Sequence, residues 1–185
     1  SRAFFKVVEI MTTSITPTPK HCYCMCEAPG GFVQGILHMY PKLKTIYASS
    51  LAAMNCPNFS GAVVHEPRTT ILTTEGNADL TKASTRDDYR TQILNKCDLI
   101  TADGAFDNDV NPEMTEVNSA HLLFAEILMA FSVQNRGGVF ILKVFGITQP
   151  ITFQLIALLC SVYSYVSVLK PKTSWAVNEI GRAHV

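Results

Sequence analysis

Short, nearly continuous apolar runs alternate along this chain with longer runs that have helical spacing. The short runs predict strands buried on both faces, at 20–27, 44–50, 98–102, 137–145 and 162–169, with a further strand near 70–73. The longer runs predict helices at 30–40, 84–95, 115–133 and 150–160. Strands that alternate with helices in this way are typical of a mostly parallel sheet with helices on both faces. The pattern therefore predicts one doubly wound, Rossmann-like α/β domain, whose ligands would bind at the carboxyl ends of the strands.

The composition excludes several classes of protein. Of 185 residues, 48% are hydrophobic and 16% charged, with a formal net charge of zero, so a disordered chain is excluded. Neutral charge argues against a protein that holds nucleic acid by bulk charge alone, although a local basic patch stays open. The first residues show no secretory signal, unless one preceded them, and the six cysteines are thinly spread. We expect reduced thiols in an intracellular protein, with a metal or redox role as the alternative.

The apolar stretch at 151–169 has the length of a membrane span. It contains Gln154 and three serines, and it divides into a helical part and a β-branched part. We interpret it as a buried helix and strand, and we expect no membrane partner.

The last residues need separate treatment. The segment Ile180–Val185 can be encoded by a DNA string that resembles a widely used sequencing adaptor read in frame. We interpret 180–185 as derived from such an adaptor, with a genuine polar tail as the alternative, and exclude it from the fold. The domain would then comprise 1–179, truncated at its C-terminal strand, and Glu179 would be native only in its first base.

The loop after the first predicted strand, 27–32, contains two adjacent glycines and runs directly into a helix. Gly30 and Gly31 would let the backbone approach a ligand closely, and Pro29 would stiffen the turn. The spacing fits neither the dinucleotide fingerprint nor the phosphate loop of nucleotide hydrolases. A ligand with an amino-acid carboxylate and a ribose would suit such a loop at a helix N-terminus.

Five short motifs follow one another along nearly the whole chain. They are Arg2–Lys6 with Glu9, Cys26–Phe32, Asp98–Gly104, Gly137–Lys143 and Lys170–Ser174. In this order they resemble the motifs of the FtsJ-like ribose 2′-O-methyltransferases, and most of all the cap-specific mRNA enzymes of eukaryotes and large DNA viruses. The resemblance implies an S-adenosylmethionine-dependent methyltransferase fold.

The resemblance also implies a catalytic tetrad, which here comprises Lys6, Asp103, Lys143 and Glu179. A ribose hydroxyl is a poor nucleophile, so its attack on a sulfonium methyl needs a base and in-line geometry. An isolated lysine has a pKa of about 10.4, which a second ammonium and partial burial would lower. We therefore assign Lys143 as the general base and Asp103 as the group that positions it. Lys6 and Glu179 would complete the network and orient the ribose.

Residues for S-adenosyl-L-methionine are expected mainly in the loop after the first strand. They comprise Glu27, Ala28, Pro29, Gly30, Gly31 and Phe32, with Asp103 at the methionine end. The stretch 75–81 is similar to a family loop, which implies that Asp79 contacts the adenine side; the alternative is a turn followed by a helix cap. Because the second strand ends without a carboxylate, either Ser49 binds the ribose weakly or another group does.

The resemblance implies 2′-O-methylation of RNA, with the first transcribed nucleotide of capped mRNA as the target. The alternatives are ribosomal or transfer RNA as the target, or a non-catalytic module that binds RNA or cofactor. We expect RNA as the partner, together with other capping enzymes or domains, and no metal. The expected location is the nucleus or cytoplasm, or a virion or viral factory for a viral protein.

Overall fold

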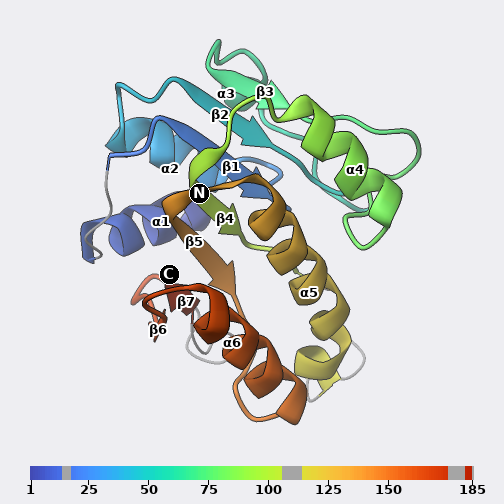
Figure 1. Cartoon of the computed structure of the whole chain (residues 1–185). Coiled ribbons are helices and arrows are strands. Elements are labelled where there is room, and N and C mark those ends of the chain that lie inside the picture. The colour runs from blue at the N-terminus through green and yellow to red at the C-terminus, as the bar shows by residue number, and fades with distance from the viewer. Residues whose placement is uncertain (14–17, 106–113, 175–181, 185) are drawn as a thin grey trace.

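The computed structural model describes residues 1–13, 18–105, 114–174 and 182–184, the last three by backbone only. Within them, seven strands form one sheet in the order β3-β2-β1-β4-β5-β7-β6 (Figure 1). The strands are β1 His21–Met25, β2 Thr45–Ala48, β3 Thr69–Ile71, β4 Cys97–Ala102, β5 Gln134–Lys143, β6 Ser167–Val168 and β7 Arg182–His184. The helices are α1 Arg2–Thr13, α2 Gly31–Met39, α3 Gly61–Val64, α4 Ala83–Gln92, α5 Thr115–Val133 and α6 Pro150–Val162.

The sheet is parallel from β3 to β5 and antiparallel where β7 pairs with β5 and β6. The predicted mostly parallel α/β fold is thus confirmed. Arg182–His184, within the segment that we excluded from the fold, forms β7. Its origin in an adaptor stays a prediction.

Alternate side chains of the central strands enter two separate cores, one on each face of the sheet. From β1, Tyr23 and Met25 pack with α4, α5 and α6, whereas Cys22 and Cys24 pack with α1, α2 and α3. All six cysteines are free, and burial raises the pKa of the Cys22 and Cys24 thiols. Burial on both faces explains why these strands are apolar at nearly every position.

Several boundaries differ from the prediction. The structure adds α1 and the short α3, which the apolar pattern did not indicate. The stretch at 151–169 divides as expected, but α6 continues to Val162 and only Ser167–Val168 form a strand. A helix and a strand compete for such apolar residues, and here packing of α6 on α5 extends the helix.

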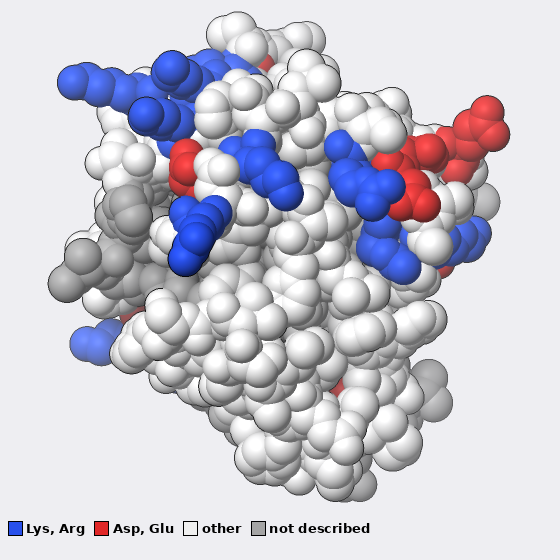
Figure 2. All heavy atoms as spheres, in the orientation of Figure 1, with Lys and Arg blue, Asp and Glu red and all other residues white. Residues whose placement is uncertain are grey.

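Helix α5 is long and apolar enough to cross a membrane by length and composition, but half of its apolar window is buried inside the protein. Figure 2 shows that charged side chains gather over the part of this face that contains β2, β3 and α4, while the surface over α5 and α6 is almost uncharged. Exposed apolar side chains there include Phe124 and Leu128 on α5 and Phe153 and Val162 on α6.

Candidate functional site

Two lysines meet one aspartate at the carboxyl edge of the sheet. Lys6 lies on α1, Asp103 directly follows β4, and Lys143 ends β5. Asp103 Oδ1 is 3.6 Å from Lys6 Nζ and 3.7 Å from Lys143 Nζ, and the three side chains are 15%, 7% and 10% exposed, respectively. Burying an ammonium is costly unless it is paired. The two lysines therefore form buried ion pairs with Asp103 and are not charges that simply lie in solvent.

The strand register explains why Asp103 and Lys143 are neighbours. Ala102 pairs with Leu142 across the parallel β4–β5 ladder, so the residue that follows each lies at the same edge. Lys143 Nζ also lies 4.7 Å from the centre of the Phe145 ring, a cation–π contact that helps to hold it.

Lys6 reaches the site because α1 packs closely on α2. An added methyl group on Gly31 would lie 2.5 Å from Ser1 Oγ and 2.7 Å from Ala3 Cβ, both on or beside α1. The bare α-carbon of Gly31 therefore faces α1. Its absent side chain allows close helix packing, and an approach of the Gly31 backbone to a ligand stays a prediction.

Glu9, one helical turn after Lys6, connects α1 to the Lys170–Ser174 motif. Its carboxylate accepts hydrogen bonds from the backbone N–H groups of Lys172 at 2.6 Å and Thr173 at 3.0 Å, and from the Thr173 hydroxyl at 2.8 Å. Partial burial opposes ionisation, but these bonds outweigh it and lower the pKa of Glu9. Two motifs at opposite ends of the chain are thus joined directly. Glu179 and Trp175 lie outside the described residues.

The loop after β1 turns sharply into α2. Cys26 has φ 55°, the Ala28–Pro29 bond is cis, and Gly30 has φ 108°. Glu27 is buried, and its Oε1 accepts a hydrogen bond of 2.5 Å from the Phe32 backbone N–H. Burial, followed by the charge of Asp103, raises the pKa of Glu27 well above 4.5. The Phe32 side chain is buried in the core, so only its backbone belongs to this loop.

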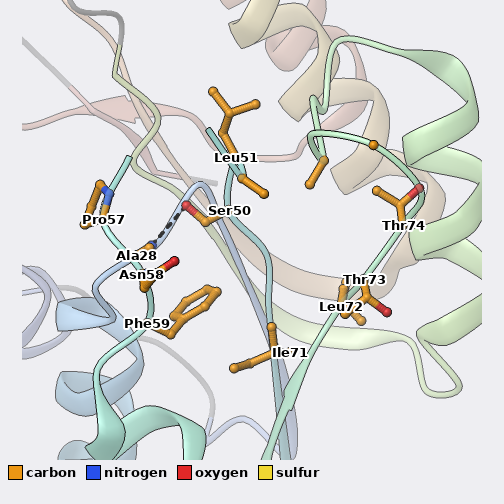
Figure 3. Close-up of a pocket in the computed structure, with 13 residues that line it drawn as sticks. Ala28, Ser50, Leu51, Pro57, Asn58, Phe59, Ile71, Leu72, Thr73 and Thr74 are labelled. Carbon is orange, nitrogen blue, oxygen red and sulfur yellow. Dashed lines mark hydrogen bonds between the residues drawn. The ribbon is translucent and has the colours of Figure 1, made fainter. Parts of the chain in front are cut away.

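A cavity of about 200 Å³ lies beside this loop (Figure 3). It is lined by Ala28 and by residues that follow β2 and β3, among them Ser50, Leu51, Leu72 and Thr73. In Figure 3, Asn58 and Phe59 border it from the facing loop, and the Ala28 N–H donates to Ser50 Oγ at 3.3 Å. The cavity is smaller than the roughly 300–1,000 Å³ common for ligand sites.

The structure separates two serines that adjoin in sequence. Ser49, our candidate for binding ribose, is 2% exposed, and its hydroxyl is 2.8 Å from the Tyr23 hydroxyl inside the core. Ser50 lines the cavity instead. Sequence reasoning missed Ser50, Asn58 and Phe59, because no motif distinguishes the loop residues that fold back on a cavity.

Asp79 adjoins the cavity through its neighbour Ala78, which lines it. Asp79 Oδ1 accepts hydrogen bonds from the backbone N–H of Thr81 at 3.0 Å and from its hydroxyl at 2.7 Å. These bonds form a turn before α4, and a contact between Asp79 and a cofactor stays a prediction. Among the described residues, no group of three His, Cys, Asp or Glu side chains could hold a metal ion.

Comparisons with known proteins find relatives over most of this chain. The cap-specific mRNA (nucleoside-2′-O-)-methyltransferase 1 of Mus musculus is 29% identical over 164 residues, covering 83% of this chain and 20% of that protein. The cap-specific mRNA (nucleoside-2′-O-)-methyltransferase 2 of Drosophila melanogaster is 26% identical over 173 residues, covering 81% and 24%. The chain thus spans about a fifth to a quarter of the length of these relatives.

Among solved structures, a putative ribosomal RNA methyltransferase from Plasmodium falciparum has a TM-score of 0.75 and 23% identity, covering 99% of this chain and 95% of that one. Human methyltransferase-like protein 13 in complex with SAH has a TM-score of 0.57 and 17% identity, covering 98% and 77%. These two establish the fold alone. The family model described as FtsJ-like methyltransferase matches residues 1–180, and the chain therefore belongs to the FtsJ-like methyltransferase family.

Proposed function

We propose that this chain is a catalytic domain that transfers a methyl group from S-adenosyl-L-methionine to a ribose 2′-hydroxyl of RNA, at the first transcribed nucleotide of capped mRNA. One observation carries the proposal: Lys6 and Lys143 share one oxygen of Asp103 at the carboxyl edge of the sheet. Sheets of this type bind their ligands at that edge. Family membership supplies the reaction class.

S-adenosyl-L-methionine, when bound, supplies an electrophilic methyl group on a sulfonium. The neutral amine of Lys143 takes the proton of the 2′-hydroxyl as the ribose oxygen bonds to the methyl carbon and the carbon–sulfur bond breaks. The proton ends on Lys143 and the electron pair on sulfur. Asp103 holds the Lys143 nitrogen in place, and Lys6, on the other side of Asp103, orients the ribose.

The residues present fit such a cofactor. Gly30 and Gly31 lie at the start of α2, and the buried carboxyl group of Glu27 connects the same loop to the centre, because it interacts with the charges of Asp103 and Lys6. The neighbouring cavity has room for part of the adenosine and is lined by Ser50 and Thr73, which carry hydroxyls. Under this proposal, Ala28 and Pro29 shape the loop, and Asp79 lies near the adenine.

A second target, ribosomal RNA, is favoured by one observation. The Plasmodium falciparum structure, named as a putative ribosomal RNA methyltransferase, has the same fold over 99% of this chain. We favour capped mRNA because the sequence relatives named above carry that specificity in their names.

The test measures transfer of an isotopic methyl group to capped RNA, the same RNA with a 5′ triphosphate, ribosomal RNA and transfer RNA. We expect capped RNA to be the best acceptor, and Lys143→Ala to lower its rate by about 10²–10⁴-fold, the usual contribution of a general base. Lys96→Ala is the matched control, because Lys96 is exposed at the opposite, amino end of β4. Transfer by Lys143→Ala at the wild-type rate would refute the base assignment, and binding of the cofactor without any transfer would indicate a non-catalytic module.

A further inference from the structure

A second carboxyl group lies below the catalytic edge, on α5. Glu126 is 0% exposed, and among the described residues neither of its oxygens has a hydrogen-bond partner. It lies beside the Cys26 thiol and the Gly104 backbone, both of which favour its ionised form and lower its pKa. A buried polar group without partners is costly, so its presence at this position needs a reason.

Glu126 packs against the turn that presents Asp103. An added methyl group on Gly104 would lie 2.5 Å from Glu126 Oε1, so glycine at 104 lets the carboxyl group approach the backbone directly after Asp103. Leu122, one helical turn earlier on α5, packs against the same position at 2.8 Å. Helix α5 therefore supports this turn through these two side chains.

The groups that face Glu126 come from three other elements: Cys26 after β1, Asp103 after β4 and Lys143 at the end of β5. Tyr89 of α4 lies on the far side of Cys26. Burial is the largest influence and raises the pKa of Glu126 to about 8, with Asp103 raising and Lys143 lowering it. The carboxyl group is therefore mainly neutral at pH 7.

We propose that Glu126 is a positioning residue of the methyl-transfer site, whose buried carboxyl group supports the Asp103–Gly104 turn and so helps to hold Asp103 beside Lys6 and Lys143. This inference rests on the proposed function. Ionised Glu126 would repel Asp103 and would also hold a proton on Lys143, which must be a neutral amine to act as the base. Both effects make the ionised form less active.

The test compares the pH dependence of methyl transfer in wild type, Glu126→Gln and Glu116→Gln. Glutamine keeps the shape of the neutral acid and cannot ionise, so Glu126→Gln should match wild type within about twofold at pH 7 and exceed it about tenfold at pH 9, one unit above the pKa. Glu116, also buried on α5 but bonded to the start of α6, is the matched control and should keep the wild-type fall in alkali. Superimposable profiles for wild type and Glu126→Gln would overturn the inference.

A positioning role also predicts a split between kinetic constants. Glu126→Ala removes the side chain that supports the turn, so it should lower kcat about tenfold and leave the KM for RNA unchanged. If Glu126 had only a structural role, its loss would lower the stability of the protein but would not change the pH profile of the remaining activity.

A readout without RNA separates failure of this inference from failure of the proposed function. The readout is the infrared carbonyl stretch of a protonated carboxyl in the difference spectrum between wild type and Glu126→Gln, which removes any band of Glu27, whose pKa burial also raises. This difference band should be present at pH 7 and disappear near pH 8. If wild type methylates no RNA but shows this band, the proposed function fails and the neutral acid remains established. If the band is missing at pH 7, the inference is overturned whatever the activity.

Discussion

Gly30 is a position at which one added methyl group should disturb the loop after β1. It begins α2 with φ 108°, a conformation that favours glycine. An added methyl group would lie well inside van der Waals contact with a side-chain methyl of Val63, and 3.3 Å from Val63 Cβ. Val63 is fully buried on α3, which is joined to the loop by a 3.0 Å hydrogen bond from Ser60 N–H to the Pro29 carbonyl. An alanine at 30 therefore meets both backbone strain and a steric clash.

The two effects can be estimated separately. A non-glycine residue in the left-handed region costs about 1–2 kcal/mol, and overpacking a buried valine costs about 1–3 kcal/mol. We expect Gly30→Ala to lower the free energy of unfolding by about 3 kcal/mol, and Val63→Ala by about 2 kcal/mol. Alanine at 63 removes the methyl groups that clash, so the double variant should be destabilised by about 1–3 kcal/mol less than the sum.

Urea unfolding of the four proteins, followed by circular dichroism, gives this double-mutant cycle. Gly137→Ala is the matched control, because Gly137 has φ 77° but no atom within 4 Å of an added methyl group. It should show the backbone cost alone, about 1 kcal/mol. Additive effects of Gly30→Ala and Val63→Ala, or equal losses in Gly30→Ala and Gly137→Ala, would show that contact with Val63 does not constrain the loop.

Two further predictions concern carboxylates that join separate elements. Glu116→Gln should lower the free energy of unfolding by about 2 kcal/mol in urea, because the carboxylate accepts bonds of 2.9 and 2.8 Å from the backbone N–H groups of Thr148 and Gln149, the two residues before α6. Partial burial opposes ionisation of Glu116, but its hydrogen bonds outweigh burial and lower its pKa. The stability that the carboxylate contributes is therefore present above about pH 4.5 and is lost as the pH falls through the lowered pKa. A difference in stability between Glu116→Gln and wild type that persists at pH 2 would contradict this. Glu9→Gln should speed hydrogen exchange of the Lys172 and Thr173 amides by about tenfold, because both amides lose a charge-assisted hydrogen bond. Unchanged protection of these amides would show that other contacts hold this segment.

The proximity of Asp103 and Lys143 could be predicted because both residues lie at the carboxyl ends of parallel strands. Apolar runs marked β4 and β5, and neighbouring parallel strands end at the same edge, so Asp103 and Lys143 had to lie together there. Lys6 had no such local signal. The apolar pattern did not indicate α1, and only the resemblance of the opening motif placed Lys6 at the site.

The sequence alone could not predict which residues pack against the glycines and the buried carboxyl group of this region. Gly30 and Gly31 were interpreted as space for a ligand, but their missing side chains face Val63 and α1. Glu126 stands alone as a charge in an apolar stretch of α5, which is a usable signal. Nothing local shows that this helix face meets Gly104, because that contact depends on how α5 packs on the sheet.

The three described polar residues of the site are held in different ways, and this difference has a consequence. Asp103 and Lys143 follow paired strands, so backbone hydrogen bonds of the β4–β5 ladder fix their separation. Lys6 is placed by the docking of α1, which depends on close packing with α2 and on the bonds from residues 172 and 173 to Glu9. Changes that loosen α1 should therefore move Lys6 while the Asp103–Lys143 pair keeps its geometry. Since we assign proton transfer to that pair and ribose orientation to Lys6, such changes should weaken substrate positioning before they weaken the base.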